Sequence, residues 1–219
     1  MDFEDVFQQT TPDGVHEYRN VIRQNLSQRW RFNMDSLLSQ EDLDEIESVA
    51  ADFEQKYNKF TTDTSSESDL QTILRAHLYI EYELEQILLK NLLHPELLRD
   101  KLRFIDKVRF VFSMGLVPRE NMDAILKINN LRNTFAHKLE YNFFEEDLNK
   151  LMDSFSNKQR TDYASYLKGE TMAGVSGKLK TALFTIWISL YEVNNISKEL
   201  AEKMQRNLEY IKRNNKKVD

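Results

Sequence analysis

The scarcity of glycine and proline constrains the fold of this chain more than any other feature. Its 219 residues include only 5 Gly and 3 Pro. Both residue types interrupt helices and populate turns, so their rarity favours long, uninterrupted helices and few hairpins. The length allows one large domain, or one domain with appendages. We therefore expect an all-α fold.

Helical periodicity divides the chain further. The segment 69–91 has apolar residues at three- and four-residue steps and is the clearest amphipathic helix. The polar run 61–68 is a predicted boundary, and 156–176 looks irregular. Short connections favour antiparallel neighbours in a bundle. The predicted helices are 16–32, 40–59, 69–91, 95–115, 119–135, 145–155 and 178–214, the last with a candidate interruption at Asn194–Asn195.

These helices predict three regions. Residues 1–65 would form a helical N-terminal extension, and 66–155 an antiparallel helical bundle as the core. Residues 156–219 would contribute a loop and a long C-terminal helix with a basic tail.

Composition excludes several kinds of site. The chain has no cysteine, which rules out disulfides, zinc–thiolate sites, iron–sulfur clusters and cysteine nucleophiles. Residues 1–5 are acidic and lack the apolar run of a secretory signal. The sequence contains no stretch of about 18 apolar residues, so no membrane span is expected. We expect a cytoplasmic protein without a membrane partner.

Charge counts mildly against a nucleic-acid partner, because the net charge is −6 and nucleic-acid-binding proteins usually have a basic excess. The local field matters more than the total, however. Basic residues cluster at 99–103, 107–109 and 212–217.

The strongest candidate site lies in the segment 131–137, near the end of a predicted helix. It places Arg132, Asn133 and His137 within six residues. Arginine is a permanent cation whose fork of donors suits phosphate. Histidine exchanges a proton near neutral pH. Together they are able to hold and cleave a phosphodiester without a metal or another cofactor.

Helix geometry separates two of these residues. Asn133 and His137 are four apart and share a face, whereas Arg132 and His137 are five apart, or about 140° around the axis. Their convergence requires the helix to unwind near Ala136, or a second copy of the chain to supply one of them. A functional site therefore predicts a homodimer.

The predicted chemistry acts on RNA. His137 would handle a proton at the 2′-hydroxyl or the leaving oxygen, and Arg132 would neutralise charge on the phosphate. Asn133 would orient the imidazole or the phosphate. The alternative is structural: Arg132 pairs with a carboxylate, and His137 caps a helix C-terminus. The candidate carboxylates are Glu140, Glu145 and Asp147.

The Arg-Asn-x-x-x-His pattern in a helical bundle resembles the HEPN superfamily. Its members are all-helical and dimerise, and many are metal-independent endoribonucleases that act as toxins, defence effectors or RNA processors. The resemblance implies that Arg132 and His137 are the catalytic pair and that Asn133 is the polar residue following the arginine. It also implies RNA as substrate and allows a protein partner such as an antitoxin.

A longer resemblance, over about 70–148, is to the mannitol operon repressor (MltR-like) family, whose helical bundle is similar to HEPN folds. That family resembles a transcriptional co-regulator without a DNA-reading module of its own. It implies the alternative function, a non-catalytic transcription regulator or protein-interaction module. The matching segments are 106–117, 131–137, 141–143 and 145–147.

A second polar row lies on the helix 69–91. His77, Glu81 and Glu85 follow at four-residue steps, a spacing at which a metal could bind. The paired Glu-x-x-His patterns of a di-iron bundle are missing. We favour a His77 satisfied by Glu81 or by a partner helix, with Tyr79 and Tyr82 beside a neighbouring cleft.

Three further features have structural interpretations. His94 precedes Pro95 and indicates the start of a helix. The segment 174–178 lacks the full spacing of a phosphate-binding loop and predicts a turn leading into a helix. The basic tail 212–217 is typical of a solvated helix end.

Overall fold

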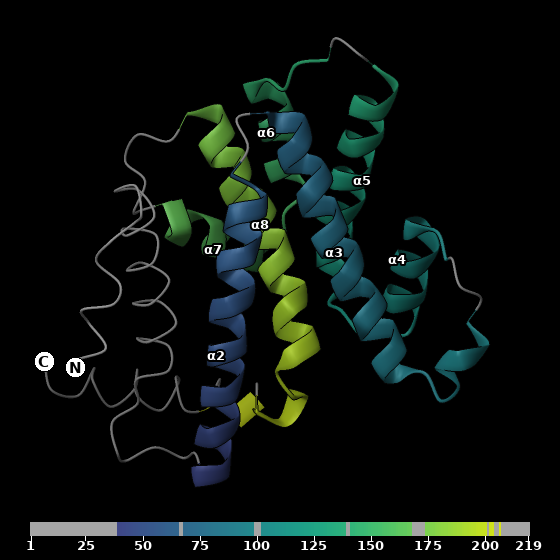
Figure 1. The fold of residues 1–219 in the computed structure, drawn as a ribbon, viewed down its shortest axis with the longest axis vertical. Coiled ribbons are helices and arrows are strands. Elements are labelled where there is room, and N and C mark those ends of the chain that lie inside the picture. Colours follow the sequence, from purple (N-terminus) through teal and green to yellow (C-terminus); the bar gives the residue numbers. More distant parts are fainter. Residues whose placement is uncertain are drawn as a thin grey trace, which may run out of the picture.

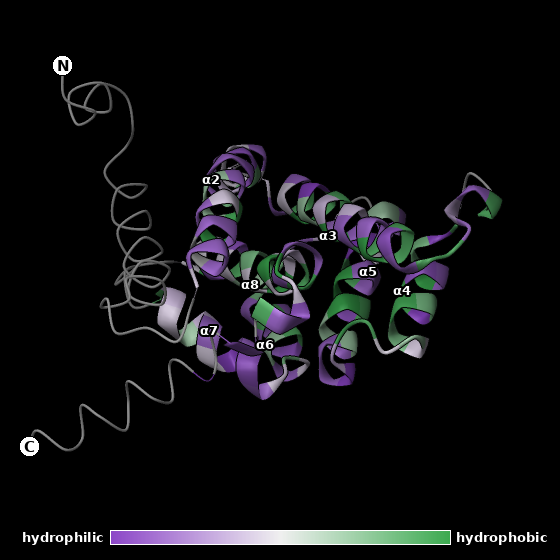
Figure 2. Ribbon diagram, turned by 90° about the horizontal axis from the view of Figure 1, so that it is seen from below, coloured by the Kyte–Doolittle hydropathy of each residue, from purple (hydrophilic) through white to green (hydrophobic). Residues whose placement is uncertain are grey.

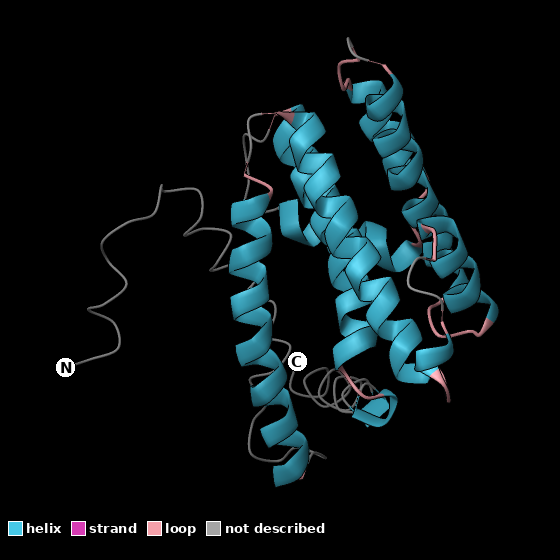
Figure 3. Ribbon diagram, turned by 45° about the vertical axis from the view of Figure 1, so that its right-hand side comes forward, coloured by secondary structure: helices cyan, strands magenta, loops and turns pink. Residues whose placement is uncertain are grey.

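The computed structural model describes residues 39–65, 68–98, 102–138, 141–167 and 174–200, together with 202, 203 and 206. Every regular element in these residues is helical, which confirms the all-α prediction (Figure 3). The predicted helix 16–32 and the basic tail lie outside the described residues. The elements are α2 (Gln40–Asp63), α3 (Asp69–Asn91), η1 (Pro95–Leu97), α4 (Phe104–Ser113), η2 (Arg119–Asn121), α5 (Met122–His137), α6 (Glu145–Asp153), α7 (Asn157–Leu167) and α8 (Val175–Asn195).

Helix α8 is the centre of the fold. Viewed from below, it is surrounded by α2, α3, α6 and α7 (Figure 2). Every residue in 181–191 is buried, so this helix is apolar on nearly all sides. Helix α8 ends at Asn195, where the sequence predicted an interruption.

Helix α3 links the two halves of the molecule. It packs on α8 and α2 on one side and on α4 and α5 on the other (Figure 1). Two of its buried side chains, Ile73 and Ile80, are completely inaccessible to solvent. The predicted bounds of this helix, 69–91, are confirmed.

Helix α2 shares the core of the bundle through its aromatic side chains. The rings of Phe60 and Trp187 stack at 4.6 Å with an angle of 5° between their planes. Phe53 and Tyr57 belong to the same buried cluster. Such aromatic pairs contribute about 0.5–1.5 kcal/mol beyond the burial of their area. The domain boundary at residues 61–68 stays a prediction. Helix α2, which lies before it, packs on α3 and α8.

One predicted helix, 95–115, is wrong as a single element. Pro95 starts only the short η1, with His94 as its N-cap, and α4 begins at Phe104. The backbone of Arg103 is extended (ψ 151°), so the helix cannot continue backwards through it. The predicted end is close to correct, because Gly115 adopts φ +68° and closes α4.

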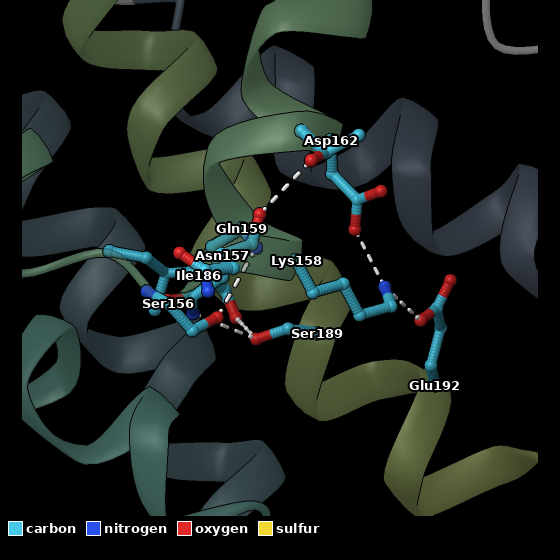
Figure 4. Close-up of polar contacts among 9 residues, drawn as sticks. Ser156, Asn157, Lys158, Gln159, Asp162, Ile186, Ser189 and Glu192 are labelled. Atoms are coloured by element: carbon cyan, nitrogen blue, oxygen red, sulfur yellow. Dashed lines mark hydrogen bonds and ion pairs between the residues drawn. The ribbon is translucent and has the colours of Figure 1, made fainter.

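A helix in the region expected to be irregular, α7, is held by polar contacts that Figure 4 shows in detail. Ser156 N–H donates to Gln159 Oε1 at 3.1 Å, and Gln159 N–H donates to Ser156 Oγ at 3.2 Å. This reciprocal pair is a capping box. Gln159 Nε2 also donates to Ser189 Oγ at 3.4 Å, and Lys158 Nζ lies 3.2 Å from Glu192 Oε2, so both side chains join α7 to α8.

No helix in the described part of the chain combines the length and the apolar character that crossing a membrane requires.

Candidate functional site

The three predicted site residues lie in the last two turns of α5. This helix buries Ala124, Ile125, Ile128, Leu131 and Phe135. The opposite positions therefore face solvent: Arg132 and His137 are exposed and Asn133 is half-buried. His137 is the last residue of the helix, and Lys138 N–H donates to Thr134 O at 3.0 Å to close the final turn.

Arg132 is held by its neighbour in the sequence. Its Nη1 donates to Asn133 Oδ1 at 3.0 Å. Among the described residues, no carboxylate forms an ion pair with Arg132. Two of the candidate partners have other contacts, since Glu145 Oε1 lies 3.9 Å from Lys178 Nζ, and Asp147 Oδ2 accepts from Phe144 N–H at 3.2 Å. The third candidate, Glu140, is outside the described residues.

The helix does not unwind between Arg132 and His137. Its hydrogen bonding continues from Met122 through His137, with Ala136 in helical geometry. Five residues of continuous helix leave Arg132 and His137 on different faces. A single chain therefore does not bring Arg132 and His137 together. Because the helix does not unwind near Ala136, their convergence requires a second copy of the chain.

A polar cluster lies between α3, α4 and α5. His77 is 5 % exposed, its Nε2 lies 3.3 Å from Asn129 Oδ1, and its Nδ1 lies 4.0 Å from Glu81 Oε2. Lys107 is 8 % exposed, and its Nζ contacts Glu81 Oε1 at 2.9 Å and Glu85 Oε2 at 2.8 Å. Both carboxylates of the predicted row thus bind a lysine, and His77 is satisfied within the fold as we favoured.

The described residues contain no group of three or more ligand-type side chains that is able to hold a metal ion. The position of Lys107 explains why the row of His77, Glu81 and Glu85 is not such a group. Its ammonium occupies the space between the two carboxylates, where a metal would have to bind.

The cluster couples electrostatically to the candidate site. Burial lowers the pKa of His77, although the contacts with Asn129 and Glu81 act in the opposite direction. The positive charges of Arg132 and Lys107 lower this pKa further. The His77 ring also packs against the Phe104 ring, with 4.3 Å between ring centres and 30° between the ring planes.

Sequence reasoning missed Lys107 and Asn129. Lys107 lies 26 residues from Glu81, and Asn129 lies 52 residues from His77, so neither pair has a local pattern. One signal was available for Lys107: it is the one cation on the face of α4 that buries Phe104, Val108 and Val111, and a buried lysine requires partners.

Two other predicted features are placed by the structure. The segment 174–178 was predicted as a turn before the helix, but α8 already begins at Val175, with Gly174 as its N-cap. Tyr79 and Tyr82 do line a cleft, but it lies between α2 and α3 over α8, whereas the His77 row faces α4 and α5.

No protein-family model matches this chain, and comparisons with curated proteins and with solved structures give no match. Function is therefore inferred from the residues and their geometry.

Proposed function

We propose that the protein is a HEPN-type, metal-independent endoribonuclease of the toxin or defence class. Its bundle would be an antiparallel HEPN-like one, and it would act as a homodimer with Arg132, Asn133 and His137 as catalytic residues. The observation that carries the proposal is that Arg132 and His137 are both exposed at the end of α5, with no carboxylate among the described residues paired to the arginine. A guanidinium of this kind is available to a phosphate.

The proposed reaction uses the RNA itself as nucleophile. His137 accepts the proton of a 2′-hydroxyl, and the 2′-oxygen attacks the adjacent phosphorus. The bond from phosphorus to the 5′-oxygen breaks, and that oxygen takes up a proton as it leaves. The products are a 2′,3′-cyclic phosphate and a 5′-hydroxyl. Arg132 stabilises the additional negative charge on the phosphate in the transition state.

Two copies of the chain would form each site. A two-fold axis beside the end of α5 would bring Arg132 of one protomer towards His137 of the other, and each dimer would then contain two equivalent sites. Asn133 keeps Arg132 in place through the 3.0 Å hydrogen bond, so the guanidinium is oriented before RNA binds.

A non-catalytic regulator or protein-interaction module of the mannitol operon repressor type is the second candidate. The observation that favours it is the exposure of apolar side chains on and before α4. Phe110 is 48 % exposed and Met114, one turn later, is 43 % exposed, while Leu93 is 94 % and Leu97 76 % exposed. Large apolar side chains that face solvent favour a protein partner.

Cleavage of RNA in EDTA separates the two candidates. Purified protein is incubated with mixed RNA, and the 3′ ends of any products are analysed for cyclic phosphate. The proposal predicts cleavage by the wild type, and a loss of at least about 100-fold in His137→Ala and in Arg132→Ala. Arg119→Ala is a matched control, because Arg119 is also exposed but lies at the opposite end of α5, 3.7 Å from Asp123. Intact RNA with a folded wild type would favour the regulator.

A further inference from the structure

A cleft of about 370 Å³ opens between α2 and α3, with α8 as its floor. Its size is at the lower end of the range for small-molecule sites, about 300–1,000 Å³. Trp187 of α8 and Glu83 of α3 form its floor, and Leu78, Tyr79 and Tyr82 of α3 form one wall. Figure 1 shows α2 and α3 side by side in front of α8. This cleft is separate from the proposed site on α5.

The wall of the cleft is apolar and accessible. Leu78 is 56 % exposed and Tyr82 is 49 % exposed, although both lie on a helix whose other apolar residues are mostly buried. The tyrosine ring thus presents a π surface to the cleft. Planar rings stack on such a surface, and the stacking is largely independent of ring identity.

The mouth of the cleft is positively charged, against the net negative charge of the chain. Lys59 is 70 % exposed and only loosely paired, 3.6 Å from Asp63. Asp63 accepts a hydrogen bond from Tyr79 Oη at 2.7 Å, and this bond lowers the pKa of the carboxyl. Arg75 also lines the cleft and is exposed, and no ion pair forms between it and a carboxylate in the part of the chain that the structure describes. Lys56 lines the cleft too, but its Nζ is paired with Asp52 Oδ2 at 3.0 Å, so Arg75 and Lys59 provide the less tightly paired positive charge at the mouth.

The carboxyl group at the floor is buried and hydrogen-bonded within the fold. Glu83 is 1 % exposed, and its two oxygens accept from Trp187 Nε1 at 3.4 Å and from Asn194 Nδ2 at 2.6 Å. Burial raises the pKa of this carboxyl, although its hydrogen bonds with Asn194 and Trp187 act in the opposite direction. The floor is a sealed, satisfied surface under an aromatic wall.

We propose that this cleft binds one nucleotide, with the base against Tyr82 and Leu78 and the phosphate on Arg75 and Lys59. The spacing along α3 fits this arrangement, because Arg75 and Tyr82 are seven residues apart, which is about 10 Å along the axis. This rise is of the order of the separation between the base and the 5′-phosphate of one nucleotide. The nucleotide is either free or one unit of a single-stranded RNA, since both present the same ring and phosphate.

Calorimetric titration with adenosine 5′-monophosphate tests the proposal, with adenosine and inorganic phosphate as separate probes. The nucleotide should bind more tightly than either part alone. In a Trp30→Phe background, which leaves Trp187 as the remaining tryptophan, binding should also change the fluorescence. A 2′-O-methylated oligoadenylate, which lacks the nucleophile for cleavage, tests the RNA source. Tighter binding of the oligomer identifies RNA as the source, and equal binding identifies the free nucleotide.

Four variants locate the binding. Tyr82→Ala and Arg75→Ala should each weaken binding about ten-fold, because each removes one contact to the base or the phosphate. Tyr82→Phe keeps the ring and should bind as the wild type does. Arg109→Ala removes an exposed arginine on α4 and is the matched control. The proposal is overturned if neither adenosine 5′-monophosphate nor the oligoadenylate binds saturably. It is also overturned if Tyr82→Ala and Arg75→Ala bind the nucleotide as tightly as Arg109→Ala does.

Discussion

Replacing Lys107 by methionine tests whether the polar cluster between α3 and α4 holds these helices together. Methionine keeps most of the apolar stem and removes the charge. Removing one partner of a fully buried ion pair costs about 3–5 kcal/mol, and an exposed pair is worth about 0–1 kcal/mol. Glu81 is 27 % exposed and Glu85 is 50 % exposed, so this cluster lies between these limits. We expect Lys107→Met to lower the free energy of unfolding by about 2 kcal/mol, including about 0.2–0.5 kcal/mol from the unscreened repulsion between the two glutamates.

Double-mutant cycles assign this loss to the two carboxylates. The distances from Lys107 Nζ are nearly equal, 2.9 Å to Glu81 Oε1 and 2.8 Å to Glu85 Oε2, so a difference between the two cycles reflects solvent screening. Combined with Lys107→Met, Glu81→Gln should show the larger coupling energy in urea unfolding at pH 7. A larger coupling for Glu85→Gln, or a loss below about 0.5 kcal/mol for Lys107→Met, would refute this explanation.

The pH dependence of the same cluster has a defined sign. Burial alone would lower the pKa of Lys107, but its hydrogen bonds to Glu85 and Glu81 outweigh burial and raise it. A cation whose pKa is raised by folding stabilises the protein fully below its unfolded pKa of about 10.4. This stabilisation disappears as the pH rises through the folded pKa. The difference in free energy of unfolding between the wild type and Lys107→Met should therefore be constant near neutral pH and should decrease at high pH.

Three smaller changes test other parts of the fold. Gly115→Ala should lower the free energy of unfolding by about 1–2 kcal/mol, because φ is +68° at this position. Gly174→Ala is the control, since an added Cβ meets no atom within 4 Å at either glycine; in thermal melts it should change stability by less than about 0.5 kcal/mol. Gln159→Ala should cost about 1 kcal/mol by opening the capping box of α7, with Asn157→Ala as the exposed control. Since burial lowers the pKa of His77 from its ordinary value of 6.5, the unfolded state takes up that proton first. Stability should thus fall as the pH drops below about 6.5, and His77→Gln should reduce this fall in urea titrations between pH 8 and 5.

Local signals were sufficient for much of the fold. The apolar spacing of α3 predicts its bounds correctly, and the asparagine pair at 194–195 marks the end of α8. The glycine at 115 correctly indicates the end of α4, because no other residue type adopts φ +68° as easily. Each of these features is decided by residues within one or two turns.

Features that depend on distant contacts were missed or misplaced. Helix α7 has weak amphipathicity and depends on Gln159 reaching Ser189, 30 residues later in the chain. The Ser156–Gln159 capping box is visible in the sequence, but the glycines at 169, 174 and 177 led us to expect irregular structure over 156–176. The start of α4 was placed too early, because Pro95 is compatible both with a long helix and with the short η1.

The candidate site was predictable only in part. The sequence placed Arg132 and His137 about 140° apart on one helix and left open whether that helix unwinds near Ala136. The structure shows it continuous to His137. The structure contains one chain, so the pairing of Arg132 with His137 of a second protomer stays a prediction.

Mixing the two inactive variants tests the composite site most directly. Arg132→Ala and His137→Ala protomers are mixed in equal amounts, exchanged through mild denaturation, and assayed for RNA cleavage in EDTA. In a mixed dimer one site loses both residues and the other regains both, so random exchange should restore about a quarter of wild-type activity. Restored cleavage is the result we predict. No gain over the separate variants, with mixed dimers shown to form, would contradict a site built from two subunits.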